Sequence, residues 1–332
     1  MRPRVAIIYN EPSPGRYHAM NEERALLGVL DEVKAVHKAL AELGYSVVRV
    51  PLVPPLEQLR EKLGHLEADL VFNLFEGFDG RPETEAVAAD MLAELGLPYT
   101  GCPGYALALA LDKVRAKALL EAAAIATPGY QLLSLQTLST FHLGFPCIVK
   151  PCGEDASHGL SENSVVGDAV SLERQVAWVT ELFGGKALVE EFMDGREFNA
   201  TILGVRELMA LPISEIAYSL PPGMPRILTF AAKWEPHSVY FQGTKAICPA
   251  EIGAEMRERI VETALSVFKL LGCSGYARVD FRLDSGGRLK VIEVNPNPDI
   301  SPGTGAARQA VAAGMTYQQF IEKLVRLALE RG

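Results

Sequence analysis

Two short segments near the C-terminal end, YARVDF and VIEVNPN, carry polar side chains at alternating positions. Side chains of a strand alternate between its two faces, so Arg278 shares a face with Asp280, and Glu293 shares a face with Asn295. The Gly-Gly turn between the segments predicts a hairpin in which Asp280 lies close to opposite Glu293. Two carboxylates and an amide oxygen on one surface suit Mg²⁺, which takes oxygen ligands and leaves positions for substrate phosphates.

A solvated polar face of an antiparallel sheet is the alternative interpretation of these residues. Against it, Val279, Phe281, Ile292 and Val294 already supply the buried side of both strands. Acidic side chains that face each other across a ladder are also unfavourable without a cation. The pattern therefore favours a metal site.

A second set of polar residues follows the apolar segment FPCIVKP. Lys150 stands at the end of this predicted strand, where burying a lysine is costly unless an anion meets it. The small residues of the loop that follows, residues 153–159, offer backbone N–H groups that can bind phosphate. His158 in this loop either adds charge for a phosphate or is an exposed loop histidine. Lys113, in LDKVRAK, is by itself equally consistent with an exposed helix lysine.

The elements that position these residues alternate at first between strand and helix. Apolar runs predict strands at 5–9, 45–50 and 70–74 with a helix at 22–43, a pattern typical of a small parallel α/β domain that ends near Gly101. The remainder predicts an α+β arrangement, with helices at 104–124, 171–183, 254–271 and 317–330 and strands at 165–166, 187–192, 197–203, 208–215 and 244–248.

Residues 221–243 hold four prolines and little periodicity. This stretch is too long for a simple connection, and we expect it to be a functional flap.

Composition limits the class of protein. The 332 residues suit two or three domains, and 48% hydrophobic with 22% charged residues is typical of a globular chain. A formal charge of -9 without a basic run predicts no nucleic-acid or membrane partner. The five cysteines contain no CxxC pair and no apolar run approaches the roughly 18 residues of a membrane span, so we expect a cytoplasmic protein without structural zinc.

The two commonest nucleotide signatures, GxxxxGK[ST] and GxGxxG, are absent from the chain. The ordered set of segments nevertheless resembles the ATP-grasp superfamily and, within it, the D-alanine–D-alanine ligase family. The segments that carry this resemblance are LPYTG at 97–101, LDK at 111–113, Lys117, IVKP at 148–151, Glu197 with Phe198, GYARVD at 275–280 and IEVN at 292–295.

The resemblance implies an ATP-grasp fold of α/β and α+β parts. A Rossmann-like domain would occupy residues 1–101, a central ATP-grasp subdomain 102–189, and a C-terminal subdomain with the metal site 190–332. It also implies an ATP-dependent carboxylate–amine ligase that forms an amide bond through an acyl phosphate. The partners would be amino acids or other small carboxylates, and a homodimer stays open.

The resemblance further implies a role for each matching position. Lysines would contact the phosphates of ATP, residues at the end of the strand at 187–192 and directly after it would contact the adenine, and a glutamate would contact the ribose. The residues are Lys113, Lys150 and Lys233 for phosphates; Glu190 and the backbone of Glu191 and Met193 for adenine; Glu197 for ribose; Asp280, Glu293 and Asn295 for two Mg²⁺ ions, with Mn²⁺ as a substitute; and Arg278, Ser157 and Lys233 for catalysis, Arg278 at the oxyanion.

The chain differs from this family at positions that select the substrate. The N-terminal Gly-Gly loop with its Ser and Glu is missing, Ala156 stands where the family has Ser, and Trp234 where it has Tyr. We therefore expect a substrate pair other than two D-alanines. An ATP-grasp ligase for another amino acid or carboxylate, and a nucleotide-binding protein without turnover, are the alternatives.

Five residues are candidates for binding substrate. Glu22 or Glu23 would receive an ammonium group, although acids at a helix N-terminus are commonly there for the helix dipole. Glu76 follows a strand at its carboxyl end, where α/β domains bind ligands. Ser301 and Thr304 would bind a substrate carboxylate or, equally well, satisfy their own turn.

Overall fold

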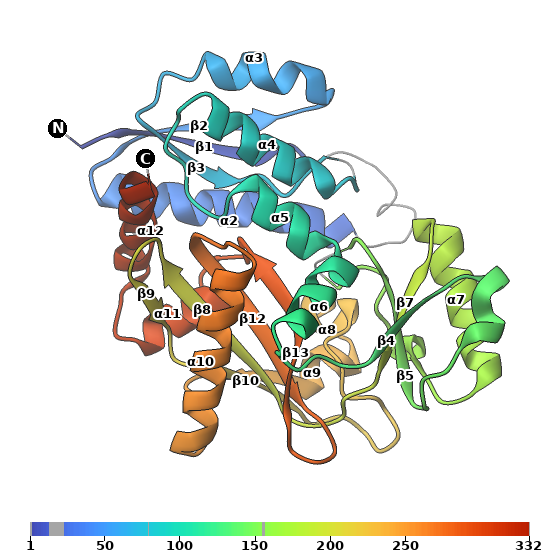
Figure 1. Cartoon of the computed structure of the whole chain (residues 1–332). Coiled ribbons are helices and arrows are strands. Elements are labelled where there is room, and N and C mark those ends of the chain that lie inside the picture. The colour runs from blue at the N-terminus through green and yellow to red at the C-terminus, as the bar shows by residue number, and fades with distance from the viewer. Residues whose placement is uncertain (1, 13–22, 79, 155–156, 332) are drawn as a thin grey trace.

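The computed structural model of the chain describes residues 2–12, 23–78, 80–154 and 157–331. Three β-sheets with helices packed on them make up the molecule (Figure 1). The N-terminal sheet lies at the top of the view, the sheet with β4, β5 and β7 at the right, and the largest sheet below.

The N-terminal sheet is parallel, with strand order β2-β1-β3. Its strands are β1 (Arg4–Asn10), β2 (Ser46–Leu52) and β3 (Leu70–Leu74), and its helices α2 (Glu23–Glu42), α3 (Leu59–Gly64) and α4 (Glu83–Glu94). Ile7 packs into the core that contains α2, whereas Ile8 packs into the core that contains α4. Burial on both faces explains why these strands are continuous apolar runs.

The predicted helix at 104–124 is wrong in one respect, because the structure has two helices there. α5 (Gly104–Leu111) ends at Asp112, and α6 (Lys113–Ala122) begins directly after it. The Asp112 side chain accepts a hydrogen bond from the Arg115 backbone N–H at 3.1 Å and so caps α6. The break places Lys113 at the first position of α6.

The central sheet is antiparallel, with strand order β4-β7-β5-β6. It contains β4 (Tyr130–Leu133), which the sequence did not predict, β5 (Cys147–Pro151), β6 (Val165–Val166) and β7 (Ala187–Glu191), with α7 (Ala169–Phe183). Val149 packs into the core with α7, whereas Ile148 packs with Ile227 of the flap. Lys150, two residues from Ile148, therefore projects from the flap side of β5.

The largest sheet has the order β11-β10-β8-β12-β13, with β9 paired to β8. Its elements are β8 (Glu197–Gly204), β9 (Leu208–Ala210), β10 (Ser214–Tyr218), β11 (Thr244–Ile247), β12 (Gly275–Leu283), β13 (Leu289–Pro296) and helix α10 (Ala254–Leu270). The single strand predicted at 208–215 is wrong, since β9 and β10 are separate strands. Pro212 between them lacks the N–H that a continuous ladder requires.

The predicted hairpin is confirmed. β12 pairs antiparallel with β13, and Asp280 lies directly opposite Glu293, with Arg278 opposite Asn295. The register shifts between Asp280 and Phe281, which indicates a β-bulge directly after Asp280.

Four helices complete the described chain. The predicted flap contains α8 (Phe230–Trp234) and α9 (Val239–Gly243), and the end of the chain contains α11 (Gly305–Ala312), which was not predicted, and α12 (Tyr317–Arg331). Buried residues of α12 share one core with α2 and β3, so the C-terminal helix joins the N-terminal domain to the largest sheet. Boundaries between domains near 101 and 189 remain a prediction.

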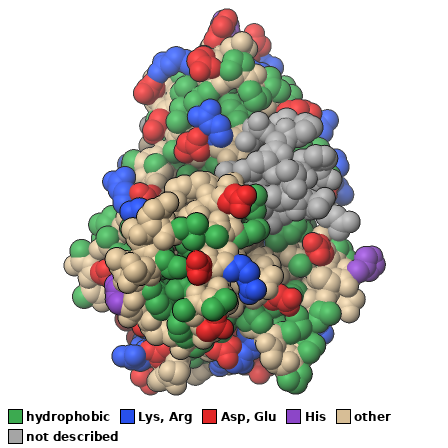
Figure 2. Space-filling model, turned by 90° about the vertical axis from the view of Figure 1, so that its right-hand side faces the viewer, with side chains coloured by type: hydrophobic (Ala, Val, Ile, Leu, Met, Phe, Trp, Pro, Cys, Tyr) green, Lys and Arg blue, Asp and Glu red, His purple; other side chains and the backbone are tan. Residues whose placement is uncertain are grey.

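Two surface properties concern the whole molecule. In the described parts of the chain, no helix is long and apolar enough to cross a membrane. On the face shown in Figure 2, Lys and Arg side chains are interspersed with Asp and Glu over the part that is drawn in colour.

Candidate active site

The face shared by β12, β13 and β8 brings the predicted metal residues together. The Asp280 carboxylate is 6% exposed and accepts hydrogen bonds from Arg278 Nε at 2.7 Å and Nη2 at 2.8 Å. Asn199 Nδ2 at 2.7 Å and Asn295 Nδ2 at 2.9 Å complete its donors. Asn199 was not predicted, but it lies opposite Asp280 on β8.

The second carboxylate of this face, Glu293, is paired with a lysine. Lys113 Nζ lies 3.1 Å from Glu293 Oε1 and also donates to the Glu154 carbonyl. Burial would raise the pKa of Glu293, but Lys113 and Lys150 outweigh it and lower that pKa. Glu293 is therefore ionised at neutral pH and attracts cations.

This donor set fits Mg²⁺ by its chemistry. Asp280 and Glu293 face one another and supply hard carboxylate oxygens, and the amide oxygen of Asn295 is the third donor. Within residues 2–12, 23–78, 80–154 and 157–331, no cluster of three or more His, Cys, Asp or Glu side chains is placed to hold a metal. A metal on this face would thus depend on the amide and on substrate oxygens.

Among the described residues, Arg278 makes hydrogen bonds through two of its three side-chain nitrogens. Its Nε and Nη2 both bind Asp280, whereas Nη1 points toward the start of α11, where a β-carbon added to Gly305 would lie 3.5 Å from it. Burial opposes the charge of Arg278, yet Asp280 and Glu293 raise its pKa. The guanidinium is therefore fixed and permanently charged, which suits binding of an oxyanion.

A buried triad lies where the nucleotide base was predicted. Glu190 is 1% exposed, and its two carboxylate oxygens lie 2.5 Å from Lys117 Nζ and 2.5 Å from Lys150 Nζ. Burial would raise the pKa of Glu190, but the two lysines lower it to about 2. The predicted adenine residue and the predicted phosphate lysine thus share one ion-pair network, with Lys117 as an additional member.

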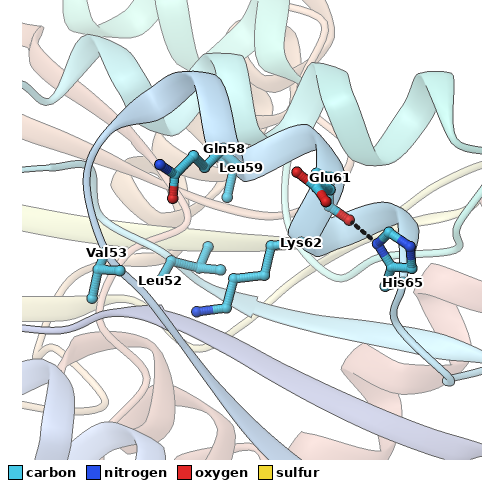
Figure 3. Close-up of a pocket in the computed structure, with 7 residues that line it drawn as sticks. All are labelled: Leu52, Val53, Gln58, Leu59, Glu61, Lys62 and His65. Atoms are coloured by element: carbon cyan, nitrogen blue, oxygen red, sulfur yellow. Dashed lines mark hydrogen bonds between the residues drawn. The ribbon is translucent and has the colours of Figure 1, made fainter.

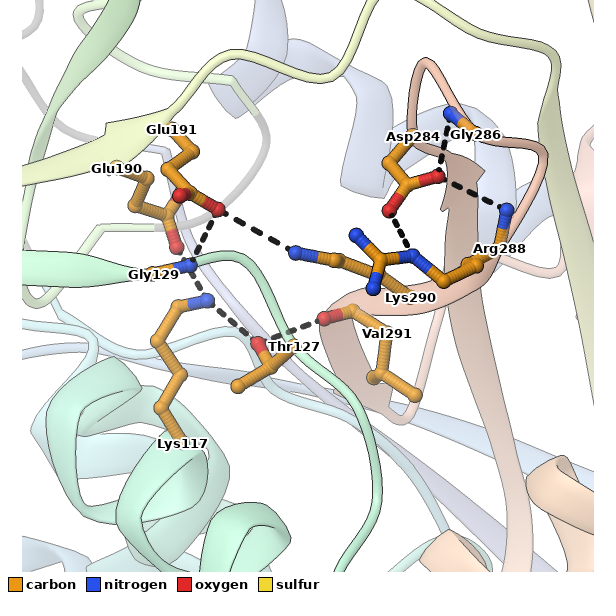
Figure 4. A network of polar contacts seen from close by, with 10 residues as sticks. All are labelled: Lys117, Thr127, Gly129, Glu190, Glu191, Asp284, Gly286, Arg288, Lys290 and Val291. Atoms are coloured by element: carbon orange, nitrogen blue, oxygen red, sulfur yellow. Dashed lines mark hydrogen bonds and ion pairs between the residues drawn. The ribbon is translucent and has the colours of Figure 1, made fainter. Parts of the chain in front are cut away.

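Hydrogen bonds connect this triad to β13, the strand that contains Glu293 (Figure 4). Lys117 Nζ donates to Thr127 Oγ1 at 2.7 Å, and Thr127 Oγ1 donates to the Val291 carbonyl at 2.9 Å. Val291 precedes Glu293 by two residues on β13, so polar contacts connect the two halves of the site.

One of the two backbone groups of Glu191 is used within the sheet. Its N–H donates to the Gly129 carbonyl at 2.9 Å and is not available to a base, because β7 pairs with the start of β4 there. The Glu191 side chain accepts from Gly129 N–H at 3.0 Å and pairs with Lys290 at 3.3 Å. Only the carbonyl of Glu191 is left for adenine.

The predicted ribose residue Glu197 is buried in a second network. Its Oε2 accepts from Arg282 Nε at 2.9 Å and from the Tyr218 hydroxyl at 2.7 Å. Burial and the Glu197 charge raise the pKa of Tyr218 well above its usual value, so its hydroxyl stays protonated and donates. Arg282 also donates to the carbonyl of Met193, the last predicted adenine residue.

Residues 157–160, which follow β5, contact the flap. The Phe230 N–H of α8 donates to the Leu160 carbonyl at 3.1 Å, and the Phe230 ring lies 5.6 Å from the ring of His158. His158 is 4% exposed, which corrects the expectation of an exposed loop histidine. Ser157 is half-buried with φ 64°, and Ala156 lies outside the described residues.

The flap also reaches the N-terminal domain. Trp234 of α8 lies against α2, where a β-carbon added to Gly28 would come within 3.0 Å of the indole. Lys233, its neighbour, is close enough to Glu293 to help lower the pKa of that carboxylate. The flap therefore lies close to both α2 and Glu293.

The substrate candidates are only partly placed. Glu22 lies outside the described residues, and Glu23 begins α2 without a described side chain. Glu76 is exposed after β3, near the buried Glu32. Burial, then Asp299 and Glu76, raise the pKa of Glu32, whose Oε1 accepts from the Ile300 N–H at 2.8 Å. No local sequence pattern indicates this acidic junction, which forms only when α2 meets the loop after β13.

The two hydroxyl candidates differ in how they are used. The Thr304 hydroxyl donates within its own turn, at 2.7 Å from the Ser301 carbonyl and 3.0 Å from the Asp299 carbonyl. Of the two alternatives for Thr304, this is the one in which it satisfies its own turn, and it uses the single proton of the Thr304 hydroxyl. Ser301 binds Asp299 Oδ1 through its backbone N–H at 2.7 Å.

Two surface hollows lie away from these residues. One, of about 300 Å³, lies between the end of β2 and α3 and is lined by Leu52, Lys62 and His65 among others (Figure 3). The other, of about 350 Å³, lies between α10 and β13 and is lined by Arg259 and Phe281 among others. None of the predicted site residues lines either hollow.

Sequence reasoning assigned no role to three buried partners that had a usable signal. Lys117 follows Lys113 by four residues and so shares its helix face. Arg282 continues the period-two pattern of Arg278 and Asp280, and Asn199 continues that of Glu197.

Comparison with known proteins agrees with this geometry. Residues 119–326 match the family model described as D-ala D-ala ligase C-terminus. A D-alanine–D-alanine ligase of Gluconobacter oxydans is 32% identical over 300 residues, covering 90% of this chain and 93% of that protein. An uncharacterized protein of Sinorhizobium fredii is 34% identical over 262 residues, covering 79% of this chain and 75% of its own length.

A crystal structure of D-alanine–D-alanine ligase from Bacillus anthracis in complex with ATP has the same fold. It superposes with a TM-score of 0.73 at 23% identity, over 99% of this chain and 98% of that one. The ATP-grasp fold expected from the sequence is confirmed. The chain belongs to the D-alanine–D-alanine ligase family.

Proposed function

We propose that this ATP-dependent ligase converts the carboxylate of one amino acid into an acyl phosphate and joins it to the amine of a second. The observation that carries the proposal is the position of Lys113. Its ammonium group contacts both the phosphate loop, at the Glu154 carbonyl, and the metal face, at Glu293. A γ-phosphate bound at this junction would lie between a lysine and two carboxylates suited to Mg²⁺.

The lysines would exchange partners when ATP binds. Lys113 and Lys150 are now neutralised by Glu293 and Glu190, and phosphate oxygens would replace part of those contacts. Phosphoryl transfer needs chiefly positioning and charge neutralisation, which two half-buried ammonium groups supply. Lys233 in the flap would add a third.

Asp280, Glu293 and Asn295 would hold the divalent cation, for which we propose two Mg²⁺ ions with Mn²⁺ as a substitute. Bound there, the cation would supply neutralisation of phosphate charge. The chain prepares for it by keeping Glu293 ionised and by fixing Asp280 with four N–H donors.

Arg278 would act in the second half of the reaction. When an amine attacks the acyl phosphate, negative charge develops on the former carbonyl oxygen, and Arg278 Nη1 can donate to it. Loss of one such donor typically lowers turnover about 10²- to 10³-fold. Ser157, in the loop beside Lys113, is proposed to help hold the transferred phosphoryl group.

We propose that the favoured substrate pair is not two D-alanines. The family's tyrosine is Trp234 here, and its indole lies on Gly28 of α2, where the site approaches the N-terminal domain. A hydroxyl that linked flap and substrate side is thereby replaced by an apolar contact, which favours a bulkier or more apolar amino acid.

The test is a panel of D- and L-amino acids in pairs, with ADP and amide product both measured. We expect D-alanine pairs to react slowly and at least one pair with a larger side chain to react faster. Efficient D-alanyl-D-alanine synthesis with no better pair would contradict the substrate proposal. Absence of ADP and amide with every pair would contradict the ligase proposal itself.

Net charge and cysteine chemistry bear on the cellular location and the partners of the enzyme. We propose a cytoplasmic enzyme that acts on small molecules, since the chain carries a formal charge of -9 and its cysteines are free thiols. A homodimer remains open to measurement by light scattering.

A further inference from the structure

Arg282 makes more polar contacts than the ligase chemistry requires. It lies on β12 with its side chain 4% exposed, directly opposite Glu197 of β8. Nε binds Glu197, Nη1 donates to the Met193 carbonyl, and Nη2 donates to the Arg226 carbonyl. One guanidinium thus uses all three of its nitrogens on three separate segments.

These three segments are the ones that would surround the base and ribose of ATP. Met193 belongs to the connection after β7, Glu197 begins β8, and Arg226 lies at the root of the flap. A second contact joins the same connection to the flap, since Arg226 binds Asp194 through Nε at 2.9 Å and Nη2 at 2.6 Å. That pair is exposed, whereas the Arg282 contacts are buried.

The Glu197 carboxylate is used on one side only. Oε2 takes both Arg282 and the Tyr218 hydroxyl, and in the described parts of the chain no donor reaches Oε1. A carboxylate fixed in this way presents one oxygen as an acceptor in a set direction. A ribose hydroxyl is a donor of the matching kind.

We propose that Arg282 is a positioning residue that holds the connection after β7, Glu197 and the flap root together, and so sets the selectivity of the site for the ribose of ATP. This inference rests on the proposed nucleotide site and deepens it. Arg282 would not touch the reacting atoms. It would act by aiming Glu197 Oε1 and by fixing the flap where it covers the ribose.

The test compares the binding of ATP and 2′-deoxyATP by calorimetry, in the presence of Mg²⁺ and without amino acids. The wild type should bind ATP roughly tenfold more tightly than 2′-deoxyATP, because a hydrogen bond to a charged acceptor is worth about that factor. In Arg282→Met, ATP affinity should fall roughly tenfold or more, and the preference over 2′-deoxyATP should disappear.

Two further variants keep the test decisive. Tyr218→Phe removes one donor from Glu197 without leaving an unpaired charge, and should reduce the preference for ATP about threefold. Arg288→Met lies in the same hairpin, with a side chain 77% exposed, and should behave as the wild type. If Arg282→Met is too unstable to isolate, Arg282→Lys takes its place, because lysine keeps the charge beside Glu197 but lacks the planar fork that reaches three segments, and the preference for ATP should again fall.

The outcomes separate the inference from the function on which it rests. Unchanged preference for ATP over 2′-deoxyATP in both Arg282→Met and Tyr218→Phe would overturn the inference while leaving ATP binding intact. Failure of the wild type to bind ATP would instead overturn the nucleotide site. Reduced stability without a change in preference would show that Arg282 is structural only.

Discussion

Replacing Lys117 with methionine tests the buried triad most sharply. Methionine is close to lysine in length but carries no charge, so the change removes one of the two cations that face Glu190 and little of the packing. Glu190 would then be left in a buried position with Lys150 alone.

The size of the effect follows from the charge balance at Glu190. Its pKa lies at about 2, against 4.5 for an ordinary glutamate, so the lysines stabilise its charged form by about 3 kcal/mol beyond the cost of burial. Breaking a buried pair at one end costs about 3 to 5 kcal/mol. Removing Lys117 also removes a buried cation, whose own pKa is lowered by burial, and this offsets part of the loss. Because Lys150 also remains, we expect Lys117→Met to lose about 1 to 2 kcal/mol of unfolding free energy at pH 7.

The lowered pKa of Glu190 also determines how the unfolding free energy changes with pH. A carboxyl group whose pKa is lowered in the folded protein adds stability above its ordinary pKa and loses it as the pH falls through the folded value. The wild type should therefore lose this contribution between pH about 4.5 and about 2. The difference between wild type and Lys117→Met should narrow over the same interval.

Urea unfolding followed by fluorescence measures this difference. In a Trp234→Phe background, Trp178 of α7 is the only tryptophan left and reports on the central sheet. Lys34→Met is the matched control, since its ammonium is exposed and pairs with an exposed Asp31, and it should change stability by under about 1 kcal/mol. Equal midpoints for Lys117→Met and Lys34→Met would refute the reasoning, as would a difference that does not vary with pH.

The remaining predictions concern the site and its surroundings. Glu293→Gln keeps the shape of the metal face but removes a charge, so turnover should fall at least about 10²-fold with the circular dichroism spectrum unchanged, and near-normal Mg²⁺-dependent ligation would contradict the assignment. Lys150→Met and Lys113→Met should each weaken ATP binding about tenfold by calorimetry, and unchanged affinity in both would mean that the phosphate site is misplaced. Amide exchange in residues 221–243 should slow when an ATP analogue and Mg²⁺ are added, whereas equal exchange would count against a lid. Because burial first, and nearby acids second, raise the pKa of Glu32, the neutral Glu32→Gln should be more stable than the wild type at pH 8 and similar to it at pH 4; the reverse order in thermal unfolding would show that Glu32 is a stabilising anion.

The parts of the fold that the sequence predicted well are those with strong local patterns. The hairpin register that places Asp280 opposite Glu293 follows from side-chain alternation and one Gly-Gly turn. The long helices α2, α10 and α12 follow from apolar periodicity. In each case the residues that decide the structure are neighbours in the chain.

The errors arose where one residue overrides its surroundings or where contacts are distant. Asp112 divides a run of good helix formers because its side chain caps the second helix. Pro212 divides a strand because it lacks an N–H. Strand β4 was not predicted, because its pairing partner β7 is distant in the sequence, with Tyr130 opposite Glu190.

The site was predicted residue by residue from family resemblance, but its charge partners were not. Lys117 and Arg282 are buried beside carboxylates that sequence reasoning had already named, but neither ion pair was predicted. Ion-pair partners follow from how α6, β7, β8 and β12 pack together, which no single segment determines.

The central claim is that a substrate carboxylate is activated by phosphoryl transfer from ATP. It is tested most directly by supplying the first amino acid of the fastest pair with ¹⁸O at both carboxylate oxygens and analysing the inorganic phosphate by mass spectrometry. Attack of the carboxylate on the γ-phosphoryl group, followed by amine attack on the acyl phosphate, moves one carboxylate oxygen to phosphate. The account predicts one ¹⁸O in phosphate for each amide formed, and amide formation with unlabelled phosphate would contradict it.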